Sequence, residues 1–166
     1  VVPVGVQYRD VNSTQLVPMS HSPFRDVRSY ALRVSPWAGG SLWIDTVGIY
    51  GDPRYDLSAS GLLLNNVRAH IDGLTAVNLS EGVAPGNSDS STTITHSLFQ
   101  HVETPIVWYS AGYPGGDPAP GSNGLTVQYT TFRGFNTAIE AYEGTLVVDS
   151  NTFVNGYTAI SGSSPK

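Results

Sequence analysis

The chain contains no cysteine, a single methionine and few charged residues. Without cysteine it can form neither a disulfide framework nor a thiolate metal site. Charged side chains make up 13% of its 166 residues, and no stretch repeats apolar residues at helical spacing, so a helical protein is not expected. No apolar run approaches the roughly 18 residues of a membrane-spanning helix. The net charge of −5 argues against a general nucleic-acid binder.

The chain is rich in residues that favour turns. It contains 18 glycines and 11 prolines among many serine, threonine and asparagine residues. Together with the low charge, this composition is typical of a turn-rich β protein. A length of 166 residues suffices for one domain with a substantial core. We therefore expect a single all-β domain that spans residues 1–166.

The segment from Gly124 to Ile160 contains a repeat. Its first unit, Leu125 to Ile139, recurs 21 residues later as Leu146 to Ile160, and Phe132 of the first unit matches Phe153 of the second. A fixed apolar pattern with a period of about 20 residues is typical of a solenoid. A repeat of this length has no room for a βαβ unit, which needs roughly 30 residues. The repeat therefore predicts a β-solenoid whose successive rungs pair in parallel and in register.

Similar patterns upstream extend the solenoid to about six rungs, each with one anchor, an apolar residue at the position of Phe132. The predicted anchors are Phe24, Val47, Val67, Phe99, Phe132 and Phe153. The same alignment predicts an inward ladder of Met19, Leu42, Leu62, Ile94, Val127 and Val148. Two residues before each anchor it predicts a polar turn column of Ser22, Asp45, Asn65, Ser97, Thr130 and Asn151.

Two insertions of loop-forming residues fall at equivalent places in consecutive rungs. They are Glu81 to Ser91 and Ala111 to Asn123, and we expect them to stack beside each other and build a binding face. Residues 1–15 are interpreted as an N-terminal cap or edge strand, 16–160 as the rungs and 161–166 as a tail. Because that tail is too short to cap the last rung, we expect a further domain or another chain to cover the C-terminal edge.

The phrases LTVQYTTFRGFNTAI and LVVDSNTFVNGYTAI resemble the rungs of right-handed parallel β-helix proteins, the pectate-lyase-like superfamily. The resemblance covers roughly Gln15 to Ile160 and implies a right-handed parallel β-helix of about six rungs with two loop insertions. That fold hosts lyases, hydrolases and non-catalytic modules, so it leaves the function open. A weaker likeness, carried by SHSPFRDVRSYALRV and LWIDTVGIYG, is to the β-helix rungs of fibrocystin-type proteins, which implies an extracellular or cell-surface location.

A set of aromatic residues and arginines forms the candidate ligand-binding site. Exposed rings beside the stacked loops would suit sugar rings, and Arg forks match uronate carboxylates. These candidates are Trp37, Trp108, Tyr109, Tyr113, Arg25 and Arg133. Arg25, Arg68 and Arg133 each follow an anchor by one residue and would form a basic strip. The alternatives are that the rings cover loop backbone and that the arginines pair with nearby acids.

Histidines and carboxylates on neighbouring rungs form the candidate catalytic site. His70 and His101 follow their anchors by three and two residues, and Asp72 and Glu103 come close behind them. With Arg68 as the base of a lyase, this group could do acid/base work, or it could hold a divalent cation, with Ca²⁺ as the candidate. The alternative is an ordinary polar turn.

Two further features have simple interpretations. His96 shares its column with Ile44, so we interpret it as a satisfied core histidine. The sequons that begin at Asn12 and Asn78 are candidate N-glycosylation sites.

The leading functional hypothesis is an extracellular or cell-surface module that binds a polysaccharide along its loop-bearing face. The second hypothesis is a polysaccharide lyase or hydrolase that acts on an acidic glycan. The third is a non-catalytic structural or assembly module whose C-terminal edge contacts a neighbouring chain.

Overall fold

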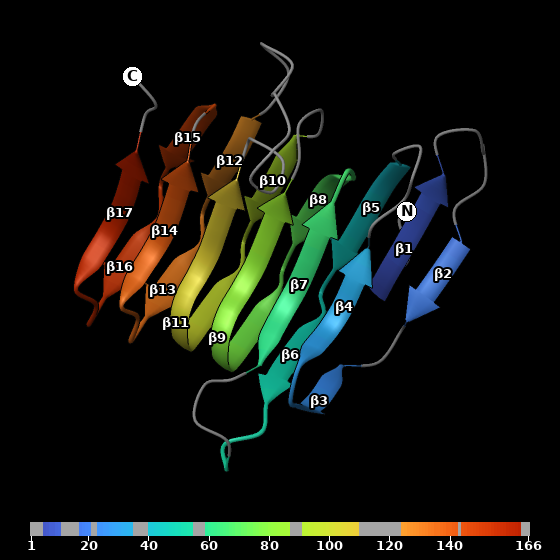
Figure 1. The fold of residues 1–166 in the computed structure, drawn as a ribbon, viewed down its shortest axis with the longest axis horizontal. Coiled ribbons are helices and arrows are strands. Elements are labelled where there is room, and N and C mark those ends of the chain that lie inside the picture. Colours follow the sequence, from blue (N-terminus) through green and yellow to red (C-terminus); the bar gives the residue numbers. More distant parts are fainter. Residues whose placement is uncertain are drawn as a thin grey trace.

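The computed structural model describes residues 5–10, 17–20, 23–34, 40–54, 59–86, 91–109, 124–142 and 144–163. The regular elements of this part of the chain are all β-strands, numbered β1 to β17 (Figure 1). It holds no apolar helix of membrane-spanning length.

One sheet, called sheet 1 below, contains the first strand of each turn. Its members are β1 (Gly5–Asp10), β2 (Val17–Ser20), β5 (Gly40–Asp45), β8 (Arg68–Asp72), β10 (Thr92–Thr95), β12 (Gly124–Gln128) and β15 (Thr145–Asp149). In space they follow the order β15-β12-β10-β8-β5-β1-β2. Neighbours from β5 to β15 pair in parallel, whereas β1 pairs antiparallel with both β5 and β2. β1 therefore covers the N-terminal edge of the parallel strands, within the segment where a cap or edge strand is expected.

The other strands form sheet 2, which has two arms. The first arm contains β3 (Phe24–Val27), β6 (Gly48–Gly51), β13 (Thr131–Arg133) and β16 (Thr152–Val154). The second arm contains β4 (Tyr30–Val34), β7 (Ser60–Asn65), β14 (Thr137–Tyr142) and β17 (Thr158–Ser163). Two longer strands, β9 (Thr75–Gly86) and β11 (Leu98–Tyr109), run through both arms. They contain left-handed residues, Asn78 and His101, between the part in the first arm and the part in the second.

One turn of the chain passes along sheet 1, then the first arm, then the second arm. For example, β12, β13 and β14 make one turn, and β15, β16 and β17 make the next (Figure 1). The chain forms about five such turns, preceded by an incomplete one of β3 and β4. The predicted all-β solenoid with parallel, in-register turns is thus confirmed.

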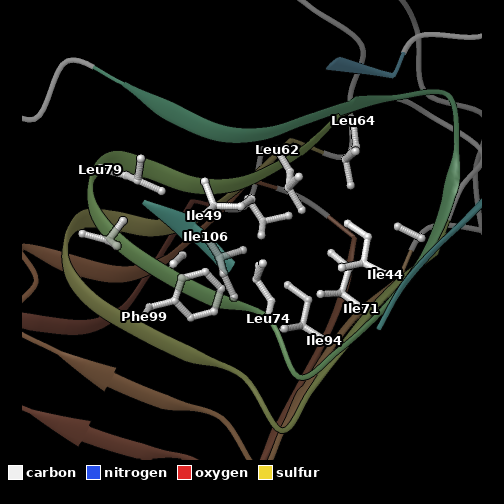
Figure 2. Packing of buried hydrophobic residues seen from close by; sticks show 14 of the residues in the cluster. Ile44, Ile49, Leu62, Leu64, Ile71, Leu74, Leu79, Ile94, Phe99 and Ile106 are labelled. Atoms are coloured by element: carbon white, nitrogen blue, oxygen red, sulfur yellow. The ribbon is translucent and has the colours of Figure 1, made fainter. Parts of the chain in front are cut away.

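The hydrophobic core fills the inside of the coil. Figure 2 shows Ile44, Ile71 and Ile94 pointing inward from sheet 1, and Leu62 and Leu64 pointing inward from the second arm. Strand alternation produces this arrangement, because successive side chains point to opposite faces. Along β8, for instance, exposed and buried residues strictly alternate.

A stack of phenylalanines confirms the predicted register in the last three turns. Phe99 pairs with Phe132, and Phe132 pairs with Phe153. The successive ring centroids are 5.3 and 5.0 Å apart, and the rings are nearly parallel. The predicted inward ladder is confirmed over the same turns, from β10 to β15.

Of the three predicted anchors upstream of this stack, Phe24 is confirmed, whereas Val47 and Val67 are wrong. The column of the first arm consists of Phe24, Ile49, Ala76, Phe99, Phe132 and Phe153. Val47 and Val67 lie instead at the corners before β6 and β8. The sequence pattern fails here because Ala76 has too little apolar surface to mark a core position. The inward ladder fails for a related reason: Leu62 lies in β7 of the second arm rather than in sheet 1.

The polar turn column exists in the last three turns, at the corner between sheet 1 and the first arm. Its members there are Ser97, Thr130 and Asn151. In the two preceding turns the equivalent positions are Leu74 and Val47, because they precede the paired residues Thr75 and Gly48. The predicted members Asp45 and Asn65 are therefore wrong, and Ser22 lies outside the described residues.

The residue before this column is left-handed in each of these turns. The members are Thr46, Gly73, His96, Tyr129 and Ser150, with φ between 46° (His96) and 68° (Gly73). Such a residue turns the corner, and its side chain points away from the core. The side chain of His96 is 65% exposed, so the interpretation as a core histidine is wrong.

The first predicted insertion is shorter than expected where the structure describes it. Glu81 to Gly86 belongs to β9 and pairs with both β7 and β11, so it is not a loop. Residues 87–90 and the whole of Ala111 to Asn123 lie outside the described part of the chain.

Candidate ligand-binding site

A shallow groove lies at the corner between the two arms of sheet 2, across the last three turns. Its volume is about 660 Å³, within the range of small-molecule sites. The side chains that line it belong to His101, Glu103, Phe135, Asn136, Asn155 and Tyr157. It contains two residues of the predicted catalytic group, His101 and Glu103.

Left-handed residues shape this corner. His101, Gly134 and Asn155 have φ of 51°, 63° and 56°, and each ends the first-arm segment of its turn. Glycine and asparagine adopt this conformation most readily, and histidine is also enriched in it. Backbone hydrogen bonds of 2.9 Å, from Asn136 N–H to Glu103 O and from Thr158 N–H to Asn136 O, hold the turns in register. The groove residues of successive turns therefore stack beside one another.

Phe135 forms the apolar floor of the groove. It is buried and meets the rings of Phe132 and Phe153 edge-on, at interplanar angles of 80° and 75°. The backbone of Gly156 lies against the Phe135 ring so closely that a Cβ there would be 2.0 Å from Phe135 Cε2. Gly134 similarly makes room for the ring of His101, whose Cδ2 would be 2.9 Å from an added Cβ. The floor is thus fixed by the core beneath it and by two glycines.

The walls of the groove are polar. They present the His101 imidazole, the Glu103 carboxylate and the amides of Asn136 and Asn155. Tyr157 stands at one side with 92% of its surface exposed, the largest value among the described large apolar or aromatic residues. Amides supply both donors and acceptors, and the carboxylate supplies acceptors only. Nowhere among the described residues do three His, Cys, Asp or Glu side chains gather as metal ligands.

The remaining members of the predicted catalytic group lie elsewhere. Arg68, His70 and Asp72 project from β8 on the outer face of sheet 1. His70 pairs with Thr93 of β10, whereas His101 lies at the bend of β11 in sheet 2. The expectation that His70 and His101 approach each other is therefore wrong, because they occupy different sides of the coil.

On the outer face of sheet 1 the polar residues make local contacts. The His70 ring stacks on Trp43 with centroids 5.7 Å apart, and burial and then the nearby Arg68 lower the pKa of His70. Asp72 Oδ1 lies 2.7 Å from His96 Nδ1, and this contact is the main cause that lowers the pKa of Asp72. The His96 ring in turn stacks on Tyr129, with centroids 5.3 Å apart.

Of the predicted sugar-stacking residues, only Trp108 has a side chain that the structure describes. Trp108 is only 3% exposed and belongs to the core, so the premise that its ring is free for a sugar is wrong. Its position pairs with Ala141 of β14, which is also buried. Trp37, Tyr113 and the side chain of Tyr109 lie outside the described residues.

The predicted basic strip is also wrong. Arg25 places its guanidinium 4.9 Å from the centre of the Tyr50 ring, and Arg133 pairs with Gln100 on the first arm of sheet 2. Arg68 belongs to sheet 1 and so cannot join them. The strip was predicted wrongly because Arg68 was aligned through Val67, which is not an anchor of the first arm.

Sequence reasoning missed the floor and one wall of the groove. Phe135, Asn136, Asn155 and Tyr157 were not candidates, although the repeat contains a signal for them. Between the anchor and the next strand, both units carry an aromatic residue and an asparagine in a glycine-containing turn, GFN in one and NGY in the other.

Comparisons with protein-family models, curated proteins and solved structures found no match to this chain. The fold therefore follows from the structure itself, and the function has to be argued from the groove.

Proposed function

We propose that this protein is a carbohydrate-binding β-solenoid module that holds a glycan in the corner groove. The observation that carries the proposal is the exposed Tyr157 ring beside a fixed aromatic floor and several converging polar groups. A sugar ring has apolar C–H faces and hydroxyl edges. An exposed tyrosine suits the faces, and amide and carboxylate groups suit the edges.

The rigidity of the groove favours binding. Phe135 is held by two neighbouring rings, and the turns are joined by backbone hydrogen bonds. A site that is already in place loses little conformational entropy when the ligand enters. The proposal includes an extracellular or cell-surface location, where such glycans occur.

A glycan-array screen of the purified chain, followed by titration calorimetry of the hits, tests this function. Tyr157→Ala should weaken binding of a hit by about tenfold, as expected for loss of one aromatic stacking contact. Tyr30→Ala is the matched control, because Tyr30 is 50% exposed and lies on β4 at the other end of the solenoid. No glycan bound, or equal affinity of the Tyr157→Ala variant, would overturn the proposal and favour the structural or assembly role.

The second candidate function is cleavage of the bound polysaccharide. It is favoured by one observation, that an imidazole and a carboxylate, His101 and Glu103, line the same groove. These are the side chains most often used for acid/base catalysis. Each array hit should be incubated with the protein and assayed for new reducing ends and for unsaturated sugars. Turnover that is lost in Glu103→Gln while binding persists would establish this activity, and binding without turnover would exclude it for that glycan.

A further inference from the structure

Two arginines face outward in register at the N-terminal end of sheet 1. Arg9 of β1 pairs with Ser41 of β5, and Ser41 pairs with Arg68 of β8. Neighbouring strands lie about 4.8 Å apart, so the two arginine positions are about 10 Å apart, with Ser41 between them. All three lie on the outer face, because Leu42 and Ala69, the residues next to Ser41 and Arg68, are buried in the core.

An aromatic stack fixes one side of this arrangement. The guanidinium carbon of Arg9 lies 5.0 Å from the centre of the Trp43 ring. Trp43 in turn stacks on His70 with an interplanar angle of 20°. A cation held over an aromatic face keeps its N–H groups at the edge free to donate hydrogen bonds. Arg9 is therefore positioned in advance of any ligand.

The charge of these arginines is not neutralised within the described structure. The ion pairs between described residues involve Arg28, Arg54 and His96, and none includes Arg9 or Arg68. Along β5 and β8 the nearest carboxylates, Asp45 and Asp72, lie four residues beyond Ser41 and Arg68, about 13 Å away at strand rise. On β1, Asp10 directly follows Arg9, and its side chain lies outside the described residues. Among the described side chains this part of the outer face is thus locally positive, although the net charge of the chain is −5.

We propose that Arg9, Ser41 and Arg68 form a second binding site, which takes carboxylate or sulfate groups of an acidic polysaccharide. Arg forks bind both kinds of oxyanion with two parallel hydrogen bonds, and the Ser41 hydroxyl adds a donor between them. Two arginines this far apart suit a chain with repeated anionic groups better than one small anion. Trp43 and His70 provide an apolar side for the sugar rings. Nucleic-acid binders typically neutralise several phosphates along an extended basic surface, and two arginines on a chain of net charge −5 do not provide one, so the polysaccharide is favoured.

The site is independent of the corner groove, since it lies on another sheet. Titration calorimetry of the whole chain with polygalacturonate, heparin and neutral dextran tests it, with a single-stranded oligonucleotide as a fourth probe. We expect binding of polygalacturonate, heparin or both, weakened by added salt because screening reduces charge attraction. The stronger of the two identifies carboxylate or sulfate as the preferred group. No binding of either, or preference for the oligonucleotide, would overturn the proposal.

Arginine variants test whether Arg9 and Arg68 bind the acidic probe. Arg9→Gln and Arg68→Gln should each lower affinity for the acidic probe by about tenfold or more, as for loss of a charge-assisted hydrogen bond. Arg68→Lys should recover only part of the affinity, because lysine keeps the charge and loses the fork. The control Arg133→Gln removes an exposed arginine from sheet 2 and should bind like the parent chain. Equal losses in Arg133→Gln and Arg68→Gln would show a non-specific charge effect and refute the site. Tyr157→Ala should leave this binding unchanged, which separates it from the groove.

Discussion

The backbone N–H of Thr130 donates a hydrogen bond of 2.8 Å to Oδ1 of Asn151, one turn further along the solenoid. The side-chain amide of Asn151 in turn donates from Nδ2 to the carbonyl of Val127, also at 2.8 Å. Thr130 has an equivalent role one turn earlier, because its hydroxyl accepts from the N–H of Ser97 at 3.4 Å. A polar column therefore joins the corners of the last three turns, where the chain bends and the regular strand pairing is interrupted.

We predict that Asn151→Ala lowers the free energy of unfolding by about 1–3 kcal/mol, the usual cost of leaving a buried polar group unsatisfied. The N–H of Thr130 and the carbonyl of Val127 would both lose a partner. Urea denaturation measures the change. Thr145→Ala, at an exposed position of the same turn, is the control. An equally small effect of both substitutions would show that the column does not stabilise the corner.

The sequence predicted the fold wherever consecutive turns repeat the same side chains. The phenylalanine stack and the polar column could be predicted from the sequence, because the same pattern of residues surrounds Phe132 and Phe153. Upstream, the equivalent of Phe132 is Ala76, which is fully buried although its side chain is a single methyl group. A position of this column can therefore hold side chains of very different size, and a pattern that requires a large apolar residue misses it.

The candidate site could be predicted only in part, for a geometric reason. Inward and outward residues alternate along a strand, but a left-handed residue bends the strand. The side chains after the bend then no longer follow the alternation of those before it. β11 contains such a residue, His101, so parity counted from Phe99 gives no guide to Trp108. The same bend carries His101 to the corner and away from His70. Sequence spacing found His101 and Glu103, but only the folded coil shows that Tyr157 is their neighbour in the groove.

Phe132→Ala should lower the free energy of unfolding by about 3–5 kcal/mol, as for deletion of a buried aromatic ring. Phe132 is fully buried and contacts rings on both sides along the stack. Chemical denaturation of this variant should be compared with Tyr30→Ala, which removes an exposed ring and should change stability by about 0.5 kcal/mol or less. A near-neutral Phe132→Ala would be incompatible with the described core.

Gly156→Ala should destabilise the protein by about 1–3 kcal/mol through overpacking. Its new methyl group would meet the Phe135 ring at 2.0 Å, so the floor of the groove would have to move. Gly124→Ala is the matched control, since the nearest atom to an added Cβ there is the carbonyl oxygen of Thr145 at 3.7 Å. Thermal melts and glycan titration should both change for Gly156→Ala only. Similar melts for the two variants would show that the Phe135 floor is not tightly packed.

Asp52 should make the stability of the protein depend on pH in the acid range. Its carboxylate is fully buried and accepts hydrogen bonds from Arg54 Nη2 at 2.7 Å and Arg54 Nε at 2.8 Å, with Arg28 Nε at 3.3 Å. The side-chain hydrogen bond from Arg54 is the main cause that lowers the pKa of Asp52 from 3.8 to about 2. Because the folded pKa is the lower one, the charged form stabilises the folded state.

We therefore predict that the stabilisation from Asp52 is complete above about pH 4 and is lost as the pH falls toward 2. The unfolded chain takes up a proton first, which shifts the equilibrium toward unfolding. Melting temperatures of the parent chain and of Asp52→Asn, measured from pH 7 to pH 2, should differ by a constant amount at the neutral end. The two curves should converge below about pH 4, since the variant has no carboxyl group to titrate there. Asp149→Asn, which removes an exposed carboxylate, is the control for the loss of one negative charge. Curves of Asp52→Asn and the parent chain that stay parallel down to pH 2 would contradict the role of the Arg54 contact.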